Sequence, residues 1–177
     1  MCGCGDTAAC AVGAGITRPG VMYDVAGTAS VFACAVGGYQ PDVKYKTILF
    51  APGVIEGLYT PMAYISGGGM CLKWFRDAIL REKKLPGTGC LGGGGAKRQR
   101  RTIFTPHFSG RVCPKRRCDK GSWLGLTMRH DYRYLYRAIV ESLAYEYKMY
   151  LDIIQESVLL EGGGSHVLSV GGGAQSA

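Results

Sequence analysis

The chain has 177 residues, 47% of them hydrophobic and 19% charged, which excludes a disordered protein and allows one domain with a buried core. Its net charge of +8 comes mainly from two short segments, 97–101 and 115–120, so the surface is not basic throughout. The sequence has neither an apolar run long enough to span a membrane nor the basic start and apolar core of a signal peptide. We therefore expect a cytoplasmic protein without a membrane partner.

Cysteine is frequent, with eight residues in the chain. Their spacings do not form the paired C-x2-C pattern of a structural zinc site. Cys34 and Cys71 lie inside apolar runs, where a free thiol behaves as a small hydrophobic side chain. The sequence predicts reduced thiols and no metal-ligating residues.

In chain order, short apolar runs alternate with segments of helical periodicity. We predict helices at 7–14, 69–80 and 131–156, strands at 21–26, 29–36, 47–50, 58–65 and 166–170, and an extended segment at 102–108. The stretch 82–101 has no periodicity, which predicts a flexible loop at 83–101. Strands that alternate with helices indicate an α/β layered domain.

Four glycine-containing turns lie at the end of a predicted strand or at the start of a predicted helix, at 5–7, 27–28, 67–69 and 171–174. Backbone amides at such turns can hold phosphate oxygens or let a flat base approach the chain. None of the four has the P-loop pattern or a complete G-x-G-x-x-G fingerprint. Each one alone is better explained as a structural turn.

Asp6 is the only carboxylate in these turns. A carboxylate in such a place can take a proton from a substrate hydroxyl. It can equally cap the helix predicted at 7–14, as Asp6 or Thr7 would do. Spacing alone favours the cap.

Five segments occur in a defined order. They are Gly-Asp-Thr-Ala-Ala at 5–9, Gly-Thr-Ala-Ser at 27–30, Gly-Gly-Gly-Met-Cys-Leu-Lys-Trp-Phe-Arg-Asp at 67–77, Gly-Ser-Trp-Leu-Gly-Leu at 121–126 followed by Leu-Tyr-Arg-Ala-Ile-Val-Glu at 135–141, and Gly-Gly-Gly-Ala-Gln-Ser at 171–176. Together they resemble the FGGY family of carbohydrate kinases, over nearly the whole chain. Tyr134 departs from the family's second signature, which usually has a polar residue there.

The resemblance implies an α/β fold of the ribonuclease H-like (actin-like ATPase) type, with residues 1–177 forming the family's C-terminal domain, incomplete at both ends. It makes Asp6 the catalytic base. It places Gly27 and Thr28 on the ATP phosphates. It assigns the adenosine to the residues at the two other turns, namely Gly69, Lys73, Gly172, Gly173 and Ala174.

The function that the resemblance implies is the phosphorylation of a sugar hydroxyl by ATP with Mg²⁺. Gly-Thr-Ala-Ser at 27–30 is closer to the xylulose and ribulose kinase branch, which suggests a ketopentose or a related polyol. The expected partner is the family's N-terminal domain, which carries most sugar contacts. The isolated chain is accordingly expected to be inactive. The sequence leaves open whether the protein forms a homodimer.

Two other functions fit parts of the sequence. The segments 97–101 and 115–120 could bind nucleic acid, but no stacking aromatics alternate with their basic residues. A non-catalytic nucleotide-binding protein of the actin fold is the second alternative. The presence of Asp6 argues against this alternative, because a protein that only senses a nucleotide does not need a base at that position.

Overall fold

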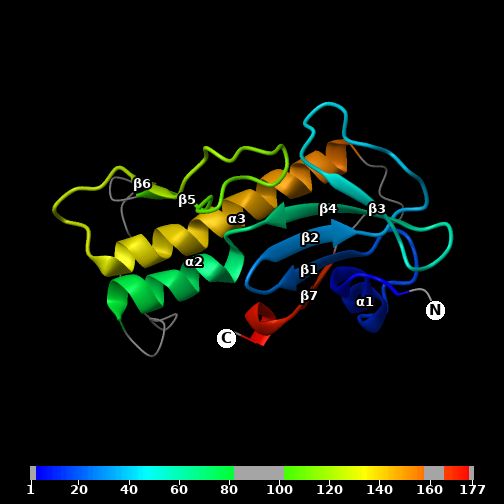
Figure 1. The fold of residues 1–177 in the computed structure, drawn as a ribbon, viewed down its shortest axis with the longest axis horizontal. Helices are drawn as coiled ribbons and strands as arrows, with labels where there is room; N and C mark the ends of the chain where they lie inside the picture. The colour runs from blue at the N-terminus through cyan, green and yellow to red at the C-terminus, as the bar shows by residue number, and fades with distance from the viewer. Residues whose placement is uncertain (1–2, 82–101, 158–165, 176–177) are drawn as a thin grey trace.

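A computed structural model describes residues 3–81, 102–157 and 166–175 (Figure 1). Its main sheet has five strands in the order β3-β4-β2-β1-β7. The strand bounds are β1 Met22–Ala26, β2 Ser30–Cys34, β3 Leu49–Pro52, β4 Tyr59–Ile65 and β7 Val167–Val170. The helices are α1 Asp6–Gly13, α2 Gly68–Trp74 and α3 Tyr132–Ser157.

Chain connectivity divides the sheet into two parts. The strands β1, β2, β4 and β3 pair antiparallel, and a tight turn joins β1 to β2. The last strand, β7, returns beside β1 and pairs with it in parallel, with Asp24 opposite Ser169 and Val25 opposite Val170. The turns after β1 and after β7 consequently lie at the same end of the sheet.

The two faces of the sheet carry different helices. Met22, Phe32 and Cys34 point to the face that α3 covers, where they form a core with Tyr150 and Ile154. The alternate residues of β1 and β2 point to the other face and pack with α1 and Ile16. This alternation is the expected result of the two-residue side-chain period of a strand.

A third core lies beyond the sheet, where α2 runs beside the first half of α3 (Figure 1). The helix continues past α2 as the π-helix η1 Phe75–Leu80. A two-stranded sheet of β5 Ile103–Thr105 and β6 Ser122–Leu124 completes this part. The core of this part is rich in aromatic side chains: Phe75, Phe104 and Tyr136 are buried, and Trp74, Phe108 and Trp123 pack against the buried residues.

The structure confirms the α/β class and most predicted elements, with some corrections. The strand predicted at 47–50 begins two residues later, as β3. Strand β6 was not predicted, because Ser122–Leu124 is too short to show a period. The loop predicted at 83–101 lies outside the described residues. None of the described helices is long and apolar enough to cross a membrane.

Candidate functional site

The start of α2 is fixed to the turn between β1 and β2. The N–H of Gly69 donates to the carbonyl of Gly27 at 3.1 Å, and the N–H of Met70 donates to the carbonyl of Thr28 at 2.9 Å. A Cβ added at Gly69 would lie 2.6 Å from the Gly27 oxygen, and one added at Gly68 would lie 2.7 Å from the Ser30 nitrogen. Glycine is required here because the helix meets the chain's own backbone, and the amides of Gly69 and Met70 are already used.

The turn after β7 lies against the same place. Gly171 has a φ of +99°, which favours glycine, and its Cβ would lie 2.7 Å from the Ala26 oxygen. A Cβ at Gly173 would lie 2.7 Å from the Ala26 Cβ, whereas Gly172 has nothing within 4 Å. Gly172, Gly173 and Ala174 belong to a single turn of 3-10 helix, η4 Gly172–Gln175.

Three of the four glycine-containing turns therefore meet around residues 26–28. Gly27, Thr28, Gly172 and Gly173 are exposed there. Lys73 is exposed in the last turn of α2. Because the sequence separates these turns by up to about 150 residues, only the sheet order brings them together.

Asp6 lies elsewhere, at the first residue of α1. It is exposed, and its Oδ1 accepts a hydrogen bond from the N–H of Thr7 at 2.7 Å. The residue that caps α1 is Gly5, and no side chain caps the helix. The prediction that Asp6 or Thr7 caps the helix is therefore wrong: Asp6 is already inside the first turn, where its carboxylate bonds to its neighbour. No hydrogen bond described for Asp6 joins it to the turns around residues 26–28.

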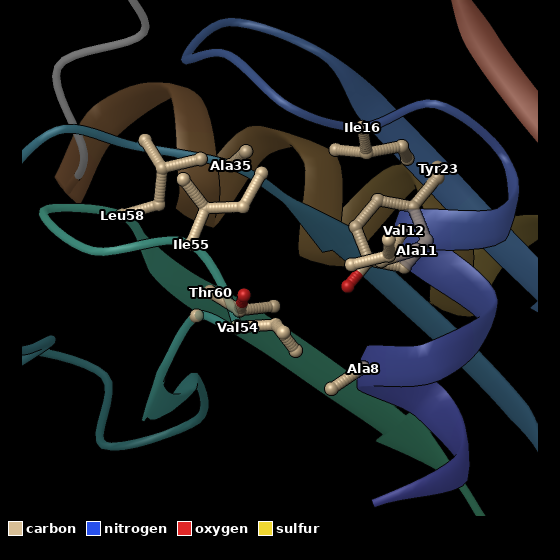
Figure 2. A pocket seen from close by; sticks show the side chains of 11 residues that line it. Ala8, Ala11, Val12, Ile16, Tyr23, Ala35, Val54, Ile55, Leu58 and Thr60 are labelled. Carbon is tan, nitrogen blue, oxygen red and sulfur yellow. The ribbon is translucent and has the colours of Figure 1, made fainter. Parts of the chain in front are cut away.

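A small cavity of about 20 Å³ lies between α1 and the sheet (Figure 2). Ala8, Ala11 and Val12 of α1 line it, and the hydroxyls of Tyr23 and Thr60 face it from the strands. The Tyr23 hydroxyl is buried and has no hydrogen-bond partner of normal geometry among the described residues. This volume holds one water molecule at most, so the cavity is too small for a substrate.

One buried carboxylate close to the turns was missed by the sequence analysis. Asp24, 9% exposed, accepts hydrogen bonds from the Tyr147 hydroxyl at 2.6 Å and from the Ser169 hydroxyl at 3.2 Å. Burial raises the pKa of Asp24, and the two hydrogen bonds offset only part of that rise. A charged residue inside the otherwise apolar strand 22–26 was the signal that could have revealed it.

The basic segment that the structure describes, 115–120, lies in the loop between β5 and β6. Its lysines and arginines are exposed, while Arg111, at the base of the loop, is bound to Glu146. The other basic segment, 97–101, lies outside the described residues. Within the described ranges, no group of three or more His, Cys, Asp and Glu side chains could hold a metal ion.

Known proteins similar to this chain show the family to which it belongs. Residues 22–177 match the model of the FGGY family of carbohydrate kinases, C-terminal domain. The matched range contains the three turns that meet around residues 26–28, whereas Asp6 precedes it.

Individual relatives match most of the chain. The chain is 27% identical to the xylulose kinase of Bacillus subtilis (strain 168), over 97% of this chain and 34% of the relative, and 27% identical to the glycerol kinase of Aquifex aeolicus (strain VF5), over 81% and 29%. The crystal structure of a xyloylose kinase from Brucella ovis superimposes with a TM-score of 0.81 and 27% identity, over 98% of this chain and 35% of that one.

Two facts follow from these matches. The fold is the ribonuclease H-like (actin-like ATPase) fold of these kinases, as predicted. The chain spans about a third of the length of the relatives that it matches.

Proposed function

Because the chain belongs to the FGGY family of carbohydrate kinases, as its C-terminal domain, we propose that it forms the nucleotide-binding half of an enzyme that phosphorylates a sugar hydroxyl with ATP. The observation that carries the proposal is the meeting of three glycine-containing turns around residues 26–28. The other half is an N-terminal domain of the same family, which supplies most sugar contacts.

The exposed turn residues suit a nucleotide. Gly27 and Thr28 lie at the tip of the β1–β2 turn, and Gly172 has open space where a side chain would stand. An open backbone of this kind lets phosphates or a flat base approach closely. Since the amides of Gly69 and Met70 donate within the protein, Gly69 is proposed to shape the site rather than to donate to the ligand. Lys73, exposed one turn further on, offers the positive charge.

When MgATP is bound, ATP supplies the phosphoryl group, and Mg²⁺ neutralises negative charge on the phosphate oxygens. This chain supplies the base. Asp6 Oδ2 accepts no hydrogen bond from the described residues, while Oδ1 is held by Thr7. We propose that Oδ2 takes the proton of the attacking sugar hydroxyl, which makes the oxygen a better nucleophile.

The test is Asp6→Asn in the full-length protein. Asparagine keeps the size of the side chain and the oxygen that Thr7 contacts, but it cannot take a proton. Turnover is expected to fall about a hundred- to ten-thousand-fold with nearly unchanged affinity for ATP, measured by coupled ADP release and by calorimetry. Asp119→Asn, in the basic loop, is the matched control and should keep normal turnover. Near-normal turnover of Asp6→Asn would reduce Asp6 to a structural residue.

The sugar is proposed to be a ketopentose or a related polyol. Support comes from Gly-Thr-Ala-Ser at 27–30 and from the xylulose kinases among the relatives. Glycerol kinases also match the chain, so the assay panel should contain xylulose, ribulose and glycerol. The nucleic-acid alternative gains no support from these relatives, which are named as kinases.

A further inference from the structure

Asp24 joins three elements of the domain at one point. It lies on β1, its Oδ2 accepts the Ser169 hydroxyl of β7, and its Oδ1 accepts the Tyr147 hydroxyl of α3. Asp24 and Ser169 are register partners across the parallel pair β1–β7. Their side chains therefore point to the same face of the sheet, the one that α3 covers. We call these three residues the Asp24 clasp.

The clasp lies just below the candidate nucleotide site. Ala26, two residues after Asp24, contacts the turn at Gly171 and Gly173, and Gly171 itself follows Ser169 by two residues. At a strand rise of about 3.3 Å per residue, the carboxylate lies about 7 Å before both turns. A shift of β7 along or away from β1 would move the two turns relative to each other.

The clasp also reaches the other side of the β1–β2 turn. Ser30, the first residue of β2, is buried, and its hydroxyl interacts with that of Tyr147. Gly68 at the start of α2 contacts Ser30. The same small network thus includes β1 and β7, which carry two of the turns, and it reaches the third turn through the contact between Ser30 and Gly68.

Hydroxyl donors are the only described partners of the Asp24 carboxylate. It borders an open pocket of about 360 Å³ with mainly apolar walls. The one lysine that lines this pocket within the described residues, Lys148, is ion-paired with Asp152. A buried carboxylate without a cation is costly unless its hydrogen bonds are kept, so β1, β7 and α3 have to stay in register.

We propose that Asp24 is a positioning residue for nucleotide binding: its carboxylate holds the β1–β2 turn and the Gly171–Gly173 turn in the arrangement that ATP requires. This inference rests on the proposed function, since it assumes that the turns contact ATP. Asp24 itself does not touch the nucleotide.

The test removes one hydroxyl at a time in the full-length protein. Tyr147→Phe and Ser169→Ala each leave the carboxylate without one donor, and each is expected to raise the Kd for MgATP about three- to tenfold. Tyr150→Phe is the matched control. It removes a buried hydroxyl from the same helix, but from the cluster with Glu146 and Arg111, so its Kd for MgATP should stay within about twofold of wild type.

A conservative variant separates positioning from general loosening of the fold. Asp24→Asn keeps the shape and the oxygen that accepts from Tyr147, and its Kd should stay within about threefold of wild type, whereas Asp24→Leu should lose binding much more strongly. In steady state, Tyr147→Phe should raise KM for ATP while KM for the sugar stays unchanged.

Two results would overturn the inference and can be told apart. The first is that wild type binds MgATP, but Tyr147→Phe has the same Kd for MgATP as the control Tyr150→Phe. The clasp is then purely structural, and the same conclusion holds if Tyr147→Phe raises the KM for ATP and the KM for the sugar equally. If wild type binds no MgATP, the proposed function fails and the clasp fails with it.

Discussion

Gly172 and Gly173 are neighbours in one turn, but their surroundings differ. A valine at Gly173, where the resemblance places adenosine, would press on Ala26 before it met any ligand, because even a Cβ there lies 2.7 Å from the Ala26 Cβ. Gly172 has nothing within 4 Å. A substitution at Gly172, unlike one at Gly173, can therefore test for a bound ligand without disturbing the protein.

We expect Gly172→Ala to raise KM for ATP by about fivefold or more, through steric conflict with the nucleotide. Its free energy of unfolding should stay within about 0.5 kcal/mol of wild type, and KM for the sugar should not change. Gly173→Ala is the companion variant, which should lower both stability and ATP affinity. Normal ATP kinetics in Gly172→Ala would mean that the nucleotide does not lie on this turn.

The buried carboxyl of Asp24 should also make stability depend on pH. Because burial raises its folded-state pKa above the unfolded value, with the bonds from Tyr147 and Ser169 offsetting part of the rise, its favourable contribution is complete below the unfolded pKa. That contribution is lost as pH rises through the folded pKa. Asp24→Asn does not titrate.

We therefore expect wild type to gain stability relative to Asp24→Asn as pH falls from 7 to 4. The quantity to compare is the free energy of unfolding of wild type minus that of Asp24→Asn, which should increase. Urea titrations at several pH values measure it. Groups with lowered pKa, such as Asp42 and Glu146, act equally in both proteins and cancel. A constant difference would show that Asp24 keeps an ordinary pKa.

At the scale of elements, the glycines at the start of α2 decide how closely that helix approaches the sheet. Gly68→Ala would bring a Cβ within 2.7 Å of the Ser30 nitrogen. Relief of this clash requires a shift of the backbone at Ser30, which is energetically costly. We expect a loss of about 1–3 kcal/mol in the free energy of unfolding, measured by chemical denaturation.

Gly13→Ala in α1 is the matched control for this prediction. Gly13 lies at the end of a helix with nothing within 4 Å, so alanine should stabilise the protein, by up to about 1 kcal/mol. Equal effects of the two substitutions would contradict the view that close approach explains the glycines of α2.

At the scale of the whole molecule, the chain carries the proposed base and nucleotide turns but spans about a third of the length of its relatives. We expect the 177-residue chain alone to show no kinase activity, because the positioning of the sugar, which we propose for an N-terminal domain, can supply several kcal/mol of the barrier lowering. It should also associate, since Val167 and Leu168 of β7 are 46% and 44% exposed.

Coupled ADP release with pentuloses and light scattering test both expectations on the purified chain. Addition of a separately expressed N-terminal domain of the family is the control that should restore turnover. A monodisperse chain that phosphorylates a sugar by itself would contradict both expectations.

The sequence by itself determined the α/β class, most element positions and the family. Periodicity is a local property, as the long amphipathic run 131–156 shows, and the ordered motifs at 27–30, 67–77 and 171–176 needed no coordinates. The pattern also marked the glycines of these motifs as special, although it could not say whether a ligand or the protein's own backbone lies against them.

Only the tertiary structure decided that question. Gly68 and Gly69 face the backbone of the β1–β2 turn, Gly173 faces Ala26, and Gly172 faces open space. It likewise showed that Asp24 of β1 meets a hydroxyl from β7 and another from α3, over 100 residues away in the chain. Such contacts depend on strand order and register, and these arise from the packing of distant segments, which no local pattern encodes.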